Sequence, residues 1–235
     1  MKGLGLKETK MKITWYGHSC FLIETAKSLL LIDPFLSGNP KAPVPADHLA
    51  PEYILLTHGH GDHVGDTVAI AERCGSTVVA NVEICKWLTG QGVANTHGQN
   101  IGGGFDYPWG RLQLTLALHS SAMPDGSYGG NPCGLLLNID GKTIYHAGDT
   151  ALFSDMKLIG EGGIDLAILP IGDNYTMGPA DALRAVQFIQ PGQVVPIHYG
   201  TFPVIRQDPG LWATRVEELT SCRVVVLEPG QTLVM

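Results

Sequence analysis

Charged side chains, and basic ones above all, are scarce in this sequence of 235 residues. Asp, Glu, Lys and Arg together make up 16% of the chain, and 15 basic against 22 acidic residues leave a formal net charge of −7. The chain therefore lacks the broad basic surface that holds nucleic acid, although a local patch stays open, and we expect no nucleic-acid partner. Hydrophobic residues make up 44% of the chain, which is ample for a core and excludes a disordered protein.

Long hydrophobic runs and paired cysteines are also missing. The longest apolar runs, such as Leu29–Ile32 and Val224–Leu227, are far shorter than the ~20 residues of a membrane helix. The first residues contain no apolar segment of the secretory kind. The five cysteines are odd in number and show no C-x-x-C spacing. We therefore expect no membrane partner and a cytoplasmic protein with reduced thiols, in which Cys20 and Cys133 pack in the core.

The order of the expected elements indicates the fold class. After a flexible tail at 1–10, residues 11–235 are predicted to form a single domain. Strands are expected at Lys12–Tyr16, Cys20–Glu24, Ser28–Asp33, Tyr53–Thr57, Thr77–Ala80, Arg111–Leu118, Cys133–Ile139, Lys142–His146, Asp165–Leu169, Gln193–Ile197 and Arg223–Leu227, helices at Asp62–Arg73, Val82–Leu88, Pro179–Ile189 and Pro209–Leu219, and loops at 38–51 and Gly98–Gly104. Hairpins come first in each half and strand–helix units follow. This order predicts an α/β (α+β) protein with two mixed sheets packed face to face and helices outside.

The hexapeptide from His58 to His63, HGHGDH, carries the strongest chemical signal. It follows an apolar strand and precedes a helix, and its two glycines let the backbone turn tightly so that the imidazoles approach one another. Three His and one Asp are the ligand types that Zn²⁺ and similar ions take. The alternative is a solvated loop that happens to be rich in His. It is disfavoured because clustered imidazoles are costly to bury without a metal or a charged partner.

Further His and Asp residues follow predicted strands in an order that resembles one superfamily. The hexapeptide is similar to the HxHxDH signature of the metallo-β-lactamase superfamily, and matching residues occur at Asp33, His119, Asp149 and His198. The segments GHSCFLIE, LLIDPFLSGNP, YHAGDT, DNYTMGP and PIHYGTFP resemble its UPF0173 metal-dependent hydrolases, which are related to ascorbate-phosphate lactonase-like enzymes. This resemblance implies a four-layer αββα sandwich, the metallo-β-lactamase fold, with metals at one edge of the sheets.

The resemblance also implies a ligand set for two divalent ions. His58, His60 and His119 would bind the first ion, Asp62, His63 and His198 the second, and Asp149 would bridge both. Zn²⁺ is the expected metal, with Mn²⁺, Fe²⁺ and Ni²⁺ as alternatives, because such sites accept all four. Two ions carry +4 and two carboxylates return −2, so the site should favour a small anionic substrate.

Other residues are candidates for supporting roles. Asp33 is expected to orient the HGHGDH loop, with a simple turn before Pro34 as the alternative. His18 is either a proton donor to the leaving group or a turn residue. Asn174, Tyr175 and Tyr199 are candidates for substrate contacts, and His146 is expected to be structural.

The predicted reaction is hydrolysis. A hydroxide bridging the two metals would attack an ester, lactone or phosphoester, while Asp62 holds the nucleophile and shuttles its proton, whether or not it acts as a true base. The alternatives are a phosphodiesterase or nuclease on the same core, an iron-pair redox protein, and a non-catalytic metal-stabilised binding protein. A β-lactamase is not expected, because those enzymes are exported. Homo-oligomerisation stays open.

Overall fold

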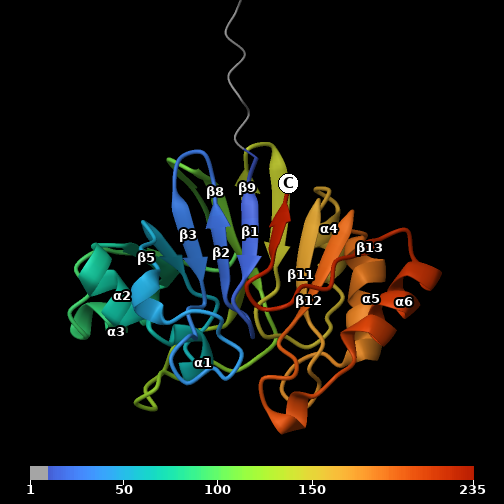
Figure 1. Cartoon of the computed structure of the whole chain (residues 1–235). Helices are drawn as coiled ribbons and strands as arrows, with labels where there is room; N and C mark the ends of the chain where they lie inside the picture. Colours follow the sequence, from blue (N-terminus) through green and yellow to red (C-terminus); the bar gives the residue numbers. More distant parts are fainter. Residues whose placement is uncertain (1–9) are drawn as a thin grey trace, which may run out of the picture.

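Two seven-stranded mixed sheets dominate the computed structural model, which describes residues 10–235 (Figure 1). The predicted tail therefore lies outside the described residues except for Lys10. The first sheet runs β14 (Thr232–Val234), β1 (Lys12–Trp15), β2 (Phe21–Glu24), β3 (Leu29–Ile32), β4 (Tyr53–Leu55), β5 (Thr77–Asn81), β6 (Thr96–Gln99). The second runs β13 (Arg223–Val224), β12 (Gln193–Ile197), β11 (Leu166–Pro170), β10 (Lys142–His146), β9 (Cys133–Ile139), β8 (Gly110–Leu116), β7 (Gly104–Tyr107).

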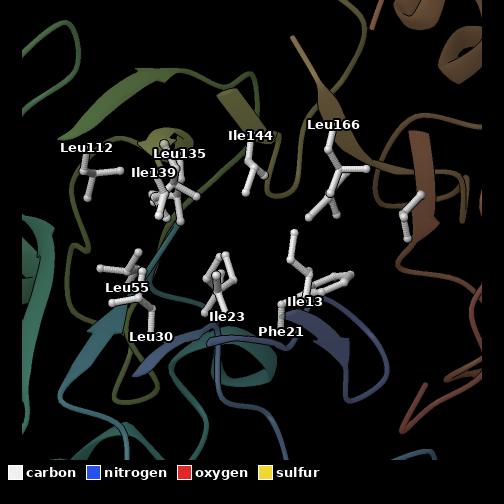
Figure 2. Close-up of a cluster of buried hydrophobic side chains, with 14 of the residues drawn as sticks. Ile13, Phe21, Ile23, Leu30, Leu55, Leu112, Leu135, Ile139, Ile144 and Leu166 are labelled. Carbon is white, nitrogen blue, oxygen red and sulfur yellow. The ribbon is translucent and has the colours of Figure 1, made fainter. Parts of the chain in front are cut away.

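The main core lies between the two sheets. Figure 2 shows side chains of the first sheet, such as Ile23 and Leu30, facing side chains of the second, such as Leu135 and Ile144. All four are fully buried. The apolar run of β3 is buried on both faces, because alternate side chains of a strand point to opposite sides. Leu30 therefore joins the core between the sheets, while Leu31 packs beneath the helices.

Helices cover the outer faces of both sheets and complete four layers (Figure 1). Residues of α2 (Thr67–Cys74) and α3 (Val82–Gly90) pack with outward side chains of the first sheet. Residues of α4 (Met156–Gly160), α5 (Pro179–Ile189) and α6 (Pro209–Leu219) pack with those of the second. Short helices occur at α1 (Gly61–Val64), η1 (Ala46–His48) and η2 (Pro203–Ile205). The predicted αββα sandwich is confirmed.

Strand direction brings the predicted ligands to one edge. β3 and β4 are parallel, as are β10, β11 and β12, and the hairpins make β1 parallel to β3 and β8 parallel to β10. The carboxyl ends of the strands within each of these sets therefore meet at one edge of their sheet. Each predicted ligand follows one of them: His58 to His63 after β4, His119 after β8, Asp149 after β10 and His198 after β12.

Several predicted boundaries were wrong for local reasons. The gap between β6 and β7 is shorter than the predicted loop Gly98–Gly104, because the first two residues of that loop belong to β6 and its last residue begins β7. The last predicted strand keeps only Arg223–Val224, and β6, β7, β14 and α4 were not predicted. β14 is three residues long and is held by pairing with β1 from the other end of the chain. Such a long-range partner leaves no signal in local periodicity.

The predicted helix Asp62–Arg73 is in fact two helices that separate at Gly65. This glycine has φ +42°, and a Cβ built on it would lie 2.3 Å from the carbonyl oxygen of Pro34. The backbone can approach Pro34 so closely only without a side chain. The break lets α1 carry Asp62 and His63 toward the sheet edge while α2 packs on the outer face.

We expect Gly65→Ala to lower the free energy of unfolding by about 2 kcal/mol or more, because the new methyl group adds both backbone strain and overlap with Pro34. Gly61→Ala is the matched control, since a Cβ there meets nothing within 4 Å. Urea unfolding of both variants measures the difference. Equal midpoints would show that the close approach at Gly65 is not needed.

Two composition-based expectations can be compared with the structure. All five cysteines are free, and Cys20 and Cys133 are buried in the core as predicted. Within residues 10–235, none of the helices has the length and apolar character needed to cross a membrane.

Candidate metal centre

Three imidazoles form the first ligand group. His58, His60 and His119 offer ring nitrogens that all lie within 4.8 Å of one another. His58 Nε2 is 3.0 Å from His60 Nδ1. The Thr57 hydroxyl lies 3.0 Å from His58 Nδ1 and donates its own hydrogen to Asp33, so it accepts from His58. This contact leaves the Nε2 lone pair of His58 directed toward the other two imidazoles.

A second group lies beside the first. Asp62, His63, His198 and His18 each offer one ligand atom within 4.8 Å of the others. The side chain of Asp62 is 32% exposed, whereas His18 is fully buried. His18 Nε2 lies 3.2 Å from Asp62 Oδ2, and His18 Nδ1 lies 3.0 Å from the Thr201 hydroxyl. His18 is therefore a neighbour of the predicted ligands and not an isolated turn residue.

Asp149 contacts members of both groups. Its Oδ2 is 3.0 Å from His198 Nε2 and 3.6 Å from His119 Nε2, and its Oδ1 is 3.4 Å from His63 Nε2. None of these approaches is a hydrogen bond: His63 Nε2, His198 Nε2 and Asp149 Oδ1 are buried without a partner. Buried polar atoms of native proteins are rarely left unpaired. Three such atoms converging from three strand ends match the donor set of a bound cation.

Asp33 supports the HGHGDH loop through hydrogen bonds. Its fully buried carboxylate accepts from Thr57 N at 2.9 Å, from the Thr57 hydroxyl at 2.6 Å and from His63 Nδ1 at 2.8 Å. Because Nδ1 of His63 is held in this way, its Nε2 faces Asp149. Asp33 thus orients His63 directly and His58 through Thr57, as predicted for a carboxylate that supports metal ligands.

The pKa shifts of the site residues favour binding of a cation. Burial lowers the pKa of His58 well below its usual value, and burial also lowers the pKa of His60 and His119, so their lone pairs are free at neutral pH. Burial alone would raise the pKa of Asp149, but His198 and His63 hold it well below the usual range. The first group therefore presents neutral imidazoles beside an ionised Asp149, the protonation states that a divalent ion needs. Burial alone would lower the pKa of His63, but Asp149 and Asp33 raise it well above its usual value, so a cation bound to His63 must displace a proton.

Backbone strain gathers at this edge. His18, Asp33 and His198 have φ values of +53°, +42° and +53°, and Asp173 and Asn174 have +62° and +53°. Residues other than Gly seldom adopt this left-handed backbone conformation, and those that do cluster at functional sites. A further tight approach occurs at Gly172, where a Cβ would lie 2.1 Å from the carbonyl oxygen of His198.

Comparison with known proteins decides the family. The β-lactamase superfamily domain matches residues 29–199. UPF0173 metal-dependent hydrolases of Bacillus thuringiensis subsp. konkukian (strain 97-27) and Shouchella clausii (strain KSM-K16) are 50% and 52% identical, covering 96% and 95% of this chain and 100% and 99% of their own. The chain belongs to the UPF0173 family of metal-dependent hydrolases.

A solved structure is similar over the same length. A metallo hydrolase from the hyperthermophilic archaeon Ignicoccus hospitalis matches with a TM-score of 0.88 and 39% identity, over 97% of this chain and 99% of its own. The metallo-β-lactamase fold and the assignment as a metal-dependent hydrolase are therefore confirmed. The His/Asp cluster of this UPF0173 hydrolase can bind metal.

The predicted substrate contacts differ in their placement. Asn174 and Tyr175 lie in the loop after β11, which reaches the metal centre through a hydrogen bond from Met177 N to the carbonyl oxygen of Thr150. Tyr175 is 56% exposed there. Tyr199 follows His198, but its ring packs on Trp15 at 5.7 Å between the sheets and lines a 340 Å³ cavity with none of the predicted metal ligands. Asn174 and Tyr175 are thus exposed on a loop tied to the residue after Asp149, whereas Tyr199 packs away from the predicted ligands.

Three hydroxyl side chains support the centre in roles that the sequence did not predict, although Thr201, like Phe202, was a candidate for the pocket wall. Thr57 and Thr201 orient imidazoles through their hydroxyls. Ser121 Oγ accepts from Gly59 N at 3.0 Å and so supports the HGHGDH loop. Thr57 directly precedes the hexapeptide, a position that could have suggested its role, but Ser121 has no such signal. His146, predicted as structural, is fully buried with Nε2 3.2 Å from the carbonyl oxygen of Ser19.

Proposed function

We propose that this UPF0173 hydrolase cleaves an ester, lactone or phosphoester bond of a small anionic substrate at two divalent ions, most simply Zn²⁺. His58, His60 and His119 would hold one ion, and Asp62, His63 and His198 the other. The observation that carries this proposal is the position of Asp149, which approaches imidazoles of both groups. An anionic group between two adjacent cations is what a two-metal site needs.

The chemistry of the bound ions would be to supply a hydroxide between them near neutral pH, by lowering the pKa of water toward ~7, and to polarise the substrate oxygen. Asp62 is placed to hold the nucleophile and to take its proton at a carboxylate oxygen. Burial alone would raise the pKa of Asp62, but the His18 hydrogen bond and the nearby His63 hold it below the usual range. Asp62 is therefore ionised and able to accept a hydrogen bond from water at neutral pH.

The role of His18 follows from its burial. A fully buried ring that is hydrogen-bonded to Asp62 and Thr201 reaches substrate only through Asp62. This favours a positioning role for His18 over the predicted donation of a proton to the leaving group, which stays a prediction. Asn174 and Tyr175 would contact the substrate from the β11 side, whereas the cavity that Tyr199 lines contains none of the proposed metal ligands, which disfavours the predicted substrate contact of Tyr199.

Other parts of the proposal rest on composition. Five free cysteines fit a reducing, cytoplasmic location. The net charge of −7 favours a small-molecule substrate over nucleic acid, while the positive metal centre favours an anion. The relation to ascorbate-phosphate lactonase-like enzymes and the oligomeric state stay predictions. The non-catalytic alternative is disfavoured, because the chain belongs to a family of hydrolases.

Metal removal tests the proposal. Chelated protein is expected to lose hydrolysis of generic esters, lactones or bis-p-nitrophenyl phosphate, and to regain it when Zn²⁺ or Mn²⁺ is added. Elemental analysis of the reactivated protein should show two ions per chain. His60→Ala should bind less metal and lose at least about tenfold in kcat/KM, since ligands matter at least as much as their supporting residues. His48→Ala, in the exposed η1, is the matched control. Full activity of the chelated protein, or hydrolysis of none of these substrates, would count against the proposal; preference for the phosphodiester would favour the nuclease alternative.

A further inference from the structure

Two phenylalanine rings pack against the ring of His18, which is hydrogen-bonded to Asp62. The ring of Phe35 lies 5.6 Å from the His18 ring, the ring of Phe202 lies 5.7 Å from it, and the two phenyl rings are 6.4 Å apart. His18 is fully buried, whereas both phenylalanines are only half-buried. Each ring therefore packs against His18 and helps to shield it from water, while part of each phenylalanine remains exposed, as does part of the Asp62 carboxylate that pairs with His18.

The segments that hold these rings also hold the metal centre. Phe35 lies two residues after Asp33, and its N–H donates to the carbonyl oxygen of Asp33 at 2.7 Å. Phe202 follows Thr201, whose hydroxyl pairs with His18. The carbonyl oxygen of Phe202 accepts from Ile205 N at 3.2 Å in the turn that begins η2. These hydrogen bonds hold the backbone of both phenylalanines beside residues that orient the ligands.

An exposed apolar residue also lies next to the first ligand group. Leu118 directly precedes His119 and is 47% exposed. It is fixed there by its N–H, which donates to the Thr150 hydroxyl at 3.0 Å, next to Asp149. A partly exposed apolar residue thus lies next to a member of each ligand group, Leu118 beside His119 and the two phenylalanines beside His18. Small-molecule sites combine a few convergent polar groups with apolar walls in this way.

We propose that Phe35 and Phe202 form an apolar subsite that binds a hydrocarbon substituent, aliphatic or aryl, next to the bond that is hydrolysed. The inference rests on the proposed function for the position of that bond at the metal centre. It narrows the substrate class to esters, lactones or phosphoesters with an apolar group of several carbons. Purely polar substrates would leave both rings exposed to water and gain nothing from them.

Binding of unreactive carboxylates to the zinc-loaded protein tests this without turnover. Each methylene removed from water is worth up to about a fourfold gain in affinity. From acetate through butyrate to hexanoate, isothermal titration should therefore show a rise of about tenfold or more overall. A flat series in the wild-type protein would overturn the inference, whatever the variants do.

Variants locate the effect. Phe35→Ala and Phe202→Ala should each flatten the series while leaving acetate affinity and zinc content within about twofold of wild type. Phe35→Leu and Phe202→Leu keep an apolar wall, should retain most of the slope and cover the case that an alanine variant does not fold. Phe105→Ala is the matched control. Phe105 is an exposed phenylalanine (45%), but it lies on β7 and packs against His97. Flattening by Phe105→Ala, or an unchanged slope in both folded alanine variants, would overturn the assignment.

The outcomes separate this inference from the proposed function. Absence of turnover with a rising carboxylate series would count against the proposed reaction alone, because binding needs no chemistry. Turnover of short and long esters with equal kcat/KM and a flat binding series would count against the apolar subsite alone. In turnover assays, the subsite predicts that kcat/KM rises from p-nitrophenyl acetate to p-nitrophenyl hexanoate.

Discussion

Asp149→Ala is expected to abolish both metal retention and hydrolysis. The variant removes a carboxylate that approaches imidazoles of both ligand groups, at 3.0 Å from His198 and 3.6 Å from His119. Loss of a residue that merely orients ligands costs about 10- to 100-fold in metal affinity or activity, so loss of this group should exceed about 100-fold in kcat/KM. Elemental analysis after gel filtration and an ester or phosphodiester assay measure the two effects.

Two controls sharpen this prediction. Asp149→Asn keeps the shape and removes the charge, so it should fold and yet retain less than the wild-type metal content. Asp165→Asn removes a carboxylate that precedes β11, where it pairs with Lys142 at 3.0 Å, and should leave metal content and activity unchanged. An Asp149→Ala protein that keeps two ions per chain and full rate would show that Asp149 bridges nothing.

Asp33→Asn is expected to lower both the stability and the metal affinity of the protein, although Asp33 is not one of the proposed metal ligands. Asp33 accepts three hydrogen bonds, two from Thr57 and one from His63, and is fully buried. Both oxygens of the carboxylate accept hydrogen bonds, whereas the amide of Asn has one oxygen and one NH₂ group. In either orientation of the amide, the NH₂ group therefore faces at least one of these donors, which loses its acceptor. A buried donor without a partner costs about 1–3 kcal/mol, and the misdirected His63 should lower metal affinity about 10- to 100-fold.

Thermal unfolding with and without chelator separates the two consequences. The chelated variant should unfold at a lower temperature than chelated wild type, because the hydrogen bonds of Asp33 do not depend on metal. Added zinc should raise the Tm of the variant less than that of wild type, because weaker binding stabilises less. Asp66, directly before α2, offers a control. Its carboxylate accepts from Leu36 N and Ser37 N of the loop that follows Asp33, outside the centre, so Asp66→Asn should lower Tm but not the zinc-induced shift. Equal zinc-induced shifts in wild type and Asp33→Asn would contradict the role given to Asp33.

Much of the site could be predicted from the sequence because its residues lie at strand ends. His58 to His63 are adjacent in sequence, and His119, Asp149 and His198 each follow an apolar strand that local periodicity reveals. Roles that depend on neighbours from distant segments could not be predicted. Phe35 contacts His18 across 17 positions of the chain and Phe202 contacts it across 184, and no local pattern links such pairs.

The same division holds for the fold. Apolar runs placed most strands, since alternate burial of side chains is a local property of a strand. Gly65 shows the opposite case: helical periodicity continues past it, and only the closeness of Pro34 explains why the helix breaks there. β14 likewise depends on β1, which lies at the other end of the chain.

The amino-acid sequence alone therefore determined the layer order, the family and the set of polar residues at the strand ends, because all three follow from short-range patterns along the chain. Tertiary structure decided that the hydroxyls of Thr57 and Thr201 orient imidazoles and that His18 is shielded by two phenyl rings. Most of these relations are distances between segments far apart in sequence. They exist only once hydrophobic burial has packed the two sheets against each other and brought their carboxyl edges together.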